Sequence, residues 1–229
     1  MMKLVIANKL YSSWSMRPWI LMRHLGIPFE EVLIPLRHED TRARILEYSP
    51  AGKVPVLIDG EARVWESLAI IDYLADLHPE ADIWPREDLA RAHARSIAAE
   101  MHAGFAPLRK AMPMFLGARF AHRDRGDEVA ADVARIVAIW REARERFGAS
   151  GPFLFGKTFG AADAMYAPTV TRLDTFSWPV DAATRAYMDA ILALPAMQEW
   201  REAALDEPWT IPYEPLLEEP VATFRRAGA

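Results

Sequence analysis

SPAGKVPVLIDGEARVWES, residues 49–67, is the stretch of sequence that decides the fold. Asp59-Gly60 is a tight-turn dipeptide between two short strand-like segments, which predicts a β-hairpin. Pro55 cannot donate a backbone hydrogen bond to a neighbouring strand, so it belongs at a sheet edge or a turn. If the Val54–Pro55 bond is cis, the backbone N–H and C=O of Val54 are free to pair with an extended ligand.

The same stretch ends at the start of a helix. Glu66-Ser67 leads into LAIIDYLADL, whose apolar residues recur with the period of a helix. The first backbone N–H groups of a helix are unpaired and carry the positive end of its dipole, so they attract anions. A backbone clamp beside an anion site suits a small peptide. A hairpin followed by a capped helix, with no ligand, is the simpler interpretation of this stretch alone.

The composition excludes several classes of protein. The chain has 229 residues, 52% hydrophobic and 26% charged, as in a soluble globular protein with a sizeable core. Its net charge of −5, with both signs interspersed, indicates neither nucleic acid nor membrane as a partner. Without cysteine it has no disulfide framework and no catalytic thiol, and its six histidines lack the spacing of metal ligands, so no metal is expected. The N-terminal apolar run is too short for a signal peptide, and no segment reaches the ~18 apolar residues of a membrane span, so we expect a cytoplasmic protein.

The order of the predicted elements divides the chain into two domains. Residues 1–77 alternate strands and helices, residues 78–88 form a linker with two prolines, and residues 89–229 are helical. The elements expected in the first part are strand 3–7, helix 18–25, strand 29–34, helix 40–48, a hairpin within 54–65 and helix 66–77. A βαβ unit followed by a hairpin and a helix is the thioredoxin-like arrangement, a small mixed sheet with helices on its faces.

We expect the second domain to be a bundle of helices, so that the whole chain is an α/β domain plus an all-α domain. Apolar residues spaced by three and four predict one helix from Leu89 to about Phe120, bent or interrupted at Pro107 and Pro113. Asp163 is expected to accept hydrogen bonds from free N–H groups at the start of a later helix. The later helices are predicted at 128–147, 160–176, 184–194 and 195–205.

A hydroxyl-rich loop, YSSWSMR at residues 11–17, separates the first strand from the first helix. Open α/β sheets bind their ligands at such strand ends. Ser15 is a natural N-cap for the helix that follows. That role accounts for Ser15 and leaves Ser12, Ser13 and Trp14 unexplained.

Three stretches resemble the cytosolic glutathione transferases. SPAGKVPVLIDG followed by WESLAIIDYLADLHPEADIWP is similar, in motif order and spacing, to the glutathione-binding half of that family. SSWSMRPW is similar to the SSCSWRVR-type motif of the zeta class, the maleylacetoacetate isomerases, and FGAADAMYAPTVTRL resembles the capping-box helix of the helical half. Two positions depart from the zeta pattern, with Trp14 in place of cysteine and Glu66 in place of glutamine. The resemblance covers nearly the whole chain and implies a thioredoxin-like domain, a helical-bundle domain and a homodimer.

The resemblance also implies roles for individual residues. Ser12 matches the serine that activates the thiol of glutathione, and Ser13 is the near alternative. The residues implied to bind glutathione are Val54 and Pro55 beside its cysteinyl part, Glu66 at the ammonium and Ser67 at the carboxylate of its γ-glutamyl end, and Lys53 on its glycyl side. The residues expected to line a co-substrate pocket are Tyr11, Trp14, Phe105, Met112 and Met114, of which the last three also fit an ordinary core.

The function that the resemblance implies is transfer of glutathione to a small hydrophobic electrophile. A free thiol with a pKa near 8.5 is only about 3% thiolate at pH 7, and a serine hydroxyl that donates a hydrogen bond to the thiolate lowers that pKa. Zeta-like cis–trans isomerisation, peroxide reduction and a non-catalytic module for protein association remain open as alternatives. Arg17 either steers an anionic co-substrate or forms a structural salt bridge, which is the commoner role.

Overall fold

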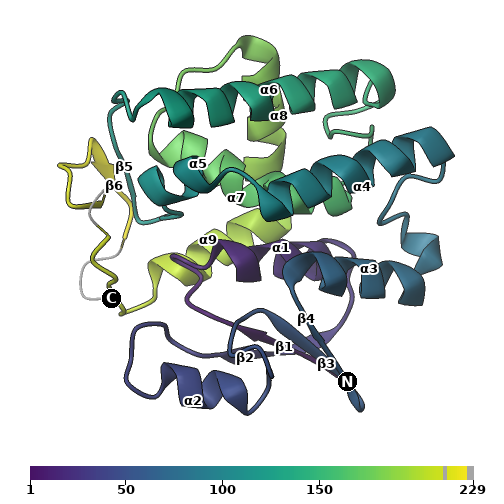
Figure 1. The fold of residues 1–229 in the computed structure, drawn as a ribbon, viewed down its shortest axis with the longest axis vertical. Helices are drawn as coiled ribbons and strands as arrows, with labels where there is room; N and C mark the ends of the chain where they lie inside the picture. Colours follow the sequence, from purple (N-terminus) through teal and green to yellow (C-terminus); the bar gives the residue numbers. More distant parts are fainter. Residues whose placement is uncertain (214–215, 226–229) are drawn as a thin grey trace.

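The computed structural model describes residues 1–213 and 216–225. The predicted helical domain runs to residue 229, so its residues 214–215 and 226–229 lie outside the described part. Figure 1 shows a sheet with flanking helices at the bottom of the view and a stack of helices above it.

A four-stranded sheet forms the first part, with the strand order β2-β1-β3-β4. Its strands are β1 (Met2–Ile6), β2 (Phe29–Leu33), β3 (Val56–Asp59) and β4 (Ala62–Trp65). β1 and β2 are parallel, whereas β3 runs antiparallel to both of its neighbours. Gly60 opens the hairpin turn with a φ of +58°, which glycine adopts without steric cost. The predicted βαβ unit and hairpin are confirmed, and the thioredoxin-like arrangement with them.

Three helices flank the sheet, namely α1 (Ser13–His24), α2 (Thr41–Leu46) and α3 (Ser67–Leu77). In Figure 1, α1 and α3 lie between the sheet and the helical part, and α2 lies on the opposite face of the sheet. Nine of the twelve residues of α1 are buried, because α1 packs against α3 on one side and against helices of the second part on the other. α1 is therefore the layer that joins the two parts.

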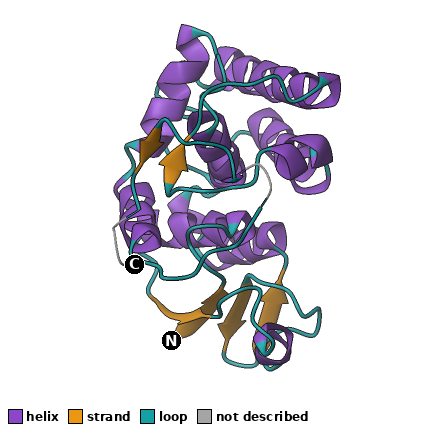
Figure 2. Cartoon of the chain, turned by 90° about the vertical axis from the view of Figure 1, so that its left-hand side faces the viewer, coloured by secondary structure: helices purple, strands orange, loops and turns teal. Residues whose placement is uncertain are grey.

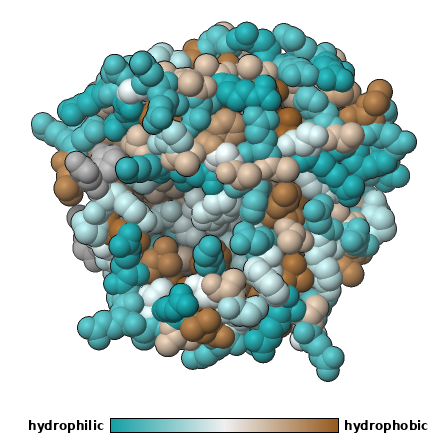
Figure 3. All heavy atoms as spheres, in the orientation of Figure 1, coloured by the Kyte–Doolittle hydropathy of each residue, from teal (hydrophilic) through white to brown (hydrophobic). Residues whose placement is uncertain are grey.

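The second part consists of helices and one short strand pair. Its helices are the 3₁₀ turn Pro79–Ala81, α4 (Asp88–Ala103), α5 (Ala106–Ala111), α6 (Asp127–Phe147), α7 (Ala161–Thr175), α8 (Ala182–Leu192) and α9 (Pro195–Leu205). The antiparallel pair β5 (Ala118–Arg119) and β6 (Ala222–Thr223) lies apart from the main sheet (Figure 2). Within the described chain, every helix is too short or too polar to cross a membrane. The face drawn in Figure 3 is mostly hydrophilic, with apolar side chains in small scattered groups.

The single helix predicted from Leu89 to Phe120 is wrong. α4 ends at Ala103, and Phe105 then takes a φ of +61°, so the chain turns before α5 begins. Pro107 does not bend a helix but occupies the first turn of α5, where its missing N–H costs nothing. α5 ends before Pro113, as expected for the residues that precede a proline, and the rest of the stretch is not helical. α1 begins five residues before the predicted residue 18, and the other boundaries agree with prediction within about two residues.

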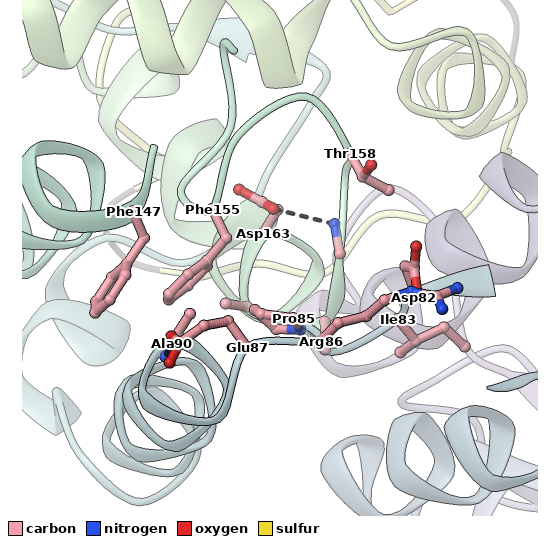
Figure 4. Close-up of a pocket in the computed structure, with 13 residues that line it drawn as sticks. Asp82, Ile83, Pro85, Arg86, Glu87, Ala90, Phe147, Phe155, Thr158 and Asp163 are labelled. Carbon is pink, nitrogen blue, oxygen red and sulfur yellow. Dashed lines mark hydrogen bonds and ion pairs between the residues drawn. The ribbon is translucent and has the colours of Figure 1, made fainter. Parts of the chain in front are cut away.

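Asp163 fastens the start of α7, the most deeply buried helix of the second part. Asp163 is 1% exposed, and its side chain accepts hydrogen bonds from the N–H of Leu154 at 3.0 Å and of Gly160 at 3.1 Å. The dashed line from Asp163 in Figure 4 is the bond to Gly160. The hydroxyl of Tyr187 on α8 donates a third bond, at 3.2 Å. Burial raises the pKa of Asp163 to about 6, against the opposing effect of these donors. The predicted role of Asp163 as a cap is confirmed.

Replacing Asp163 with alanine should lower the free energy of unfolding by about 2–4 kcal/mol, because three buried donors lose their acceptor. Asp181→Ala is the matched control, since Asp181 is an exposed cap that accepts one backbone N–H, from Thr184 at 2.8 Å, and otherwise forms an exposed ion pair with Arg141 at 2.9 Å. That change should cost about 1 kcal/mol. Urea denaturation measures both, and equal losses would contradict the special role of Asp163.

Candidate functional site

A cavity of about 210 Å³ lies where the hairpin meets the start of α3. The residues that line it are Trp14, Lys53, Val54, Pro55, Trp65, Glu66 and Ser67. All five residues predicted to bind a small peptide are among them, together with Trp14 from the first helix. Trp65 was not predicted, although it directly precedes Glu66. A larger cavity of about 340 Å³, between the start of α4 and the start of α7 (Figure 4), contains none of the predicted site residues.

The backbone around this cavity has two unusual features. The Val54–Pro55 peptide bond is cis, which meets the condition set by the sequence analysis. Glu66, between β4 and α3, has a φ of +70°, a value uncommon for residues other than glycine and often found at functional sites. Ser67 is the first residue of α3 and is completely buried, while Glu66 is exposed. A hydroxyl and the free N–H groups of a helix N-terminus therefore meet beside an exposed carboxylate.

Ser12 and Ser13 stand at the start of α1 and do not line the cavity. They are 7% and 8% exposed. The hydroxyl of Ser12, at the N-cap position, does not cap the helix but donates a hydrogen bond to Ser15 Oγ at 2.8 Å. The prediction that Ser15 is the N-cap is wrong, because α1 begins two residues earlier and Ser15 lies within its first turn.

The loop that precedes Ser12 is held by Glu207, which follows α9. The Glu207 carboxylate accepts the backbone N–H of Lys9 at 2.6 Å and that of Leu10 at 3.1 Å. Glu207 is 6% exposed, and burial raises its pKa, which the two N–H donors oppose. The conformation of the loop at residues 8–12, here called the serine loop, therefore depends on a residue 198 positions away in sequence.

Arg17 is a buried cation without a carboxylate partner in the described part of the chain. It is 1% exposed, and its Nε donates to the carbonyl of Met165 on α7 at 3.1 Å. Its Nη1 lies 3.4 Å from Ser67 Oγ, to which it donates. The predicted salt bridge is therefore wrong. Burial lowers the pKa of Arg17 well below its ordinary value, and the charges of Arg109 and Arg172 lower it further.

Two guanidinium groups contact the indole of Trp14. The Arg17 Cζ lies 4.2 Å from the ring centroid, and the Arg109 Cζ on α5 lies 4.6 Å from it. Arg109 is half-buried, and its Nε has no hydrogen-bond partner within the described residues. Burial lowers its pKa, and the charge of Asp132 opposes that shift. Arg109 was not predicted, because it lies in no motif and approaches Trp14 only in the folded chain.

His102 on α4 reaches the cavity from the helical part. Its Nε2 lies 3.4 Å from Glu66 Oε2, and its ring packs edge-on against Trp14 with centroids 5.3 Å apart. Burial lowers the pKa of His102, the positive charge of Arg17 lowers it further, and Glu66 raises it. His102 therefore connects the helical part to Glu66, a predicted ligand-binding residue.

The predicted co-substrate residues other than Trp14 do not form a second wall of this cavity. The hydroxyl of Tyr11 accepts the N–H of Ile211 at 3.1 Å, and burial raises its pKa. Phe105, Met112 and Met114 are 8%, 0% and 1% exposed. They are buried, as the alternative of an ordinary core expects, and their place in a co-substrate pocket stays a prediction.

The residues of the site do not suggest a metal centre. In the described ranges, 1–213 and 216–225, no three side chains of the kinds that bind metals gather as a metal ion would require. The chemistry available here is a carboxylate, a buried hydroxyl, helix N–H groups and the guanidinium groups of Arg17 and Arg109. These groups suit a ligand that carries both an ammonium and carboxylates.

Fold and site together define a class of protein, in which a thioredoxin-like domain with a peptide-sized cavity precedes a helical domain. Residues 11–77 match the glutathione S-transferase N-terminal domain, and residues 126–203 match the glutathione S-transferase C-terminal domain. The two matches together span more than half of the 229 residues. The chain belongs to the glutathione S-transferase family.

Individual relatives include isomerases of the zeta type. A probable maleylacetoacetate isomerase of Caenorhabditis elegans is 36% identical over 104 residues, which are 43% of this chain and 48% of that protein, so the chain spans about half the length of that relative. The maleylacetoacetate isomerase of Pseudomonas aeruginosa is 26% identical over 204 residues, 86% of this chain and 94% of that protein. A glutathione transferase homologue from Burkholderia GL BGR1, solved with bound glutathione, matches 89% of this chain and 97% of its own at 20% identity and a TM-score of 0.67, which confirms the fold.

Replacing His102 with glutamine should reduce the dependence of stability on pH. The pKa of folded His102 is lowered, so the unfolded chain binds a proton at pH values where the folded chain does not. The free energy of unfolding therefore rises with pH between about pH 5 and 7, and His102→Gln should make this rise shallower. It should not abolish the rise, because burial lowers the pKa of His24 and His93 as well.

Urea titrations at several pH values measure this slope. His38→Gln, at an exposed histidine, is the control and should leave the slope unchanged. A slope in His102→Gln equal to that of the wild type would show that His102 is not shielded from protonation.

Proposed function

We propose that this protein is a glutathione transferase, which binds glutathione in the 210 Å³ cavity and activates its thiol as a thiolate. The observation that carries the proposal is the meeting of Val54, Glu66 and Ser67 in one cavity, beside the start of α1. Membership of the glutathione S-transferase family supports it. The thiolate then attacks a small electrophile, and its sulfur forms a bond to the electrophilic carbon while the leaving group departs with its electron pair.

The binding roles follow from charge. The exposed Glu66 carboxylate pairs with the ammonium of the γ-glutamyl end, and Ser67 with the N-terminal amides of α3 takes its carboxylate. Arg17, 3.4 Å from Ser67 Oγ, adds a positive charge behind this carboxylate. Val54 pairs its backbone with the cysteinyl part, as an added strand would. Lys53, exposed at the edge of the cavity, serves the glycyl carboxylate.

The thiol is activated by a hydrogen bond rather than by a base. A serine hydroxyl cannot take a proton from a thiol near neutral pH, but it can donate to the thiolate. A hydrogen bond to a charged group contributes about 1.5–3 kcal/mol, which lowers the thiol pKa by about one to two units. We assign this role to Ser12, with Ser13 as the alternative. The N-terminus of α1, which begins at Ser13, stabilises the same negative charge.

A zeta-like isomerase is the second candidate function. The Pseudomonas aeruginosa isomerase aligns with 86% of this chain, and Arg109 offers a positive charge beside Trp14, with an Nε that has no hydrogen-bond partner among the described residues. In this reaction the thiolate adds to a double bond and leaves again after rotation, so glutathione is regenerated. An anionic substrate would favour this function, whereas a neutral one would favour transfer. Turnover assays with substrates of both kinds, with and without peroxide, separate transfer, isomerisation and peroxide reduction.

Family membership also supports two statements about the protein in the cell. We propose that it is a homodimer and that it acts in the cytoplasm, where glutathione is available. Sedimentation of the purified protein tests the first proposal, and fractionation of the source cells tests the second.

Glutathione should bind saturably in a calorimetric titration, and Ser67→Ala should weaken that binding roughly 10- to 100-fold. The reason is the loss of one hydrogen bond to a carboxylate. Ser96→Ala is the control, because the Ser96 hydroxyl is exposed on α4 and donates to the carbonyl of Ala92. If the wild type binds no glutathione at millimolar concentration, the enzyme proposal fails and a non-catalytic module takes its place.

Ser12→Ala should leave the binding of protonated glutathione nearly intact and raise the pKa of the bound thiol by about one to two units. The ultraviolet absorbance of the thiolate, followed against pH at saturating glutathione, measures that pKa. Ser13→Ala is the matched comparison. If the pKa of the bound thiol in Ser12→Ala equals that of the wild type, and the pKa in Ser13→Ala is raised, the role moves to Ser13.

A further inference from the structure

Ser15 is a completely buried serine to which neither helix capping nor the proposed site gives a role. Its Oγ accepts the N–H of Ala7, directly after β1, at 3.1 Å. The same oxygen lies 2.8 Å from Ser12 Oγ. Ser15 thus connects the end of the central strand to the hydroxyl assigned to thiol activation.

The donor is fixed in one of these two hydrogen bonds and can change in the other. A backbone amide can only donate, so the bond from Ala7 to Ser15 has one direction. Two hydroxyls can exchange donor and acceptor by rotating their O–H bonds, so the bond between Ser12 and Ser15 can run either way. As it stands, Ser12 donates to Ser15. While it does so, the proton of Ser12 is engaged and cannot point at a thiolate.

We propose that Ser15 is a positioning residue for thiol activation and that the Ser12–Ser15 hydrogen bond reverses when glutathione binds. The inference rests on the proposed function. In the reversed state, Ala7 N–H donates to Ser15, Ser15 donates to Ser12, and Ser12 donates to the thiolate. No covalent bond forms or breaks and no proton changes its oxygen, because only the two hydroxyl rotors turn.

This series of hydrogen bonds strengthens the bond from Ser12 to the thiolate for two reasons. Hydrogen bonds in series polarise one another inside a protein, where the dielectric constant is low. In addition, Ser15 has no exposed surface, so water does not compete with Ser12 for its hydroxyl. Ser12 with a donor behind it is therefore a better donor to the thiolate than a serine without one.

The test is a double-mutant cycle on the pKa of bound glutathione. The four proteins are the wild type, Ser12→Ala, Ser15→Ala and the double variant, and the thiolate absorbance is followed against pH at saturating glutathione. Ser15→Ala should raise the pKa of the bound thiol by about 0.5 to 1 unit, as expected for the loss of one neutral hydrogen bond. The double variant should match Ser12→Ala alone, because Ser15 acts only through Ser12.

A merely structural role for Ser15 gives different results. Loss of the shape of the loop would weaken the binding of glutathione at low pH, where the thiol is protonated in every variant, whereas the relay leaves that affinity unchanged. An unchanged thiol pKa in Ser15→Ala, or shifts that add in the double variant, would overturn the inference and leave the proposed function standing. A wild type that binds no glutathione, or whose bound thiol is not acidified, would overturn both.

Discussion

The guanidinium of Arg17 is the charge around which the two parts of this protein are assembled. Moving such an ion out of water costs several kcal/mol, and no carboxylate of the described residues offsets that cost directly. Instead Arg17 donates to a carbonyl of α7 and to the hydroxyl of Ser67 on α3, and it stacks on Trp14 of its own helix. These contacts hold α1, α3 and α7 at the positions that create the site.

The positive potential that results is local. The whole chain carries a net charge of −5, yet Arg17 shares its surroundings with Arg109 and Arg172, whose charges lower its pKa. Arg172 is itself so deeply buried that its pKa falls to about 9. An anion that enters this region meets several positive charges at low dielectric constant, where electrostatic attraction is stronger than in water. A thiolate and carboxylates are the ligands that gain most from it.

The parts of the fold that the sequence predicted well are those with local signals. The Asp59-Gly60 turn, the periodic helix after Glu66 and the capping role of Asp163 each depend on residues a few positions apart, and the cavity between hairpin and helix follows from them. The long helix from Leu89 failed because Gly104 and Phe105 turn the chain where the apolar spacing continues.

The parts of the site that were not predicted depend on contacts between segments far apart in the sequence. His102 and Arg109 belong to no motif and become site residues only because the fold brings α4 and α5 to Glu66 and Trp14. The pairing of Arg17 could not be deduced either, since its partners are a backbone carbonyl of α7 and a serine fifty positions away. Ser12 and Ser15 lie within one motif, but Ser15 was predicted as the N-cap because the start of the helix was placed too late.

The contact between Glu207 and the serine loop has a consequence for synthesis of the chain. A ribosome makes Lys9 and Leu10 almost at once, but the carboxylate that receives their N–H groups follows 198 and 197 residues later. The sheet and its hairpin can fold as soon as they emerge, since domains fold as units during synthesis. The serine loop acquires its final anchor only after α9 has left the ribosome. A nascent chain that ends before Glu207 holds the hairpin and the start of α3 beside a serine loop that still lacks this anchor.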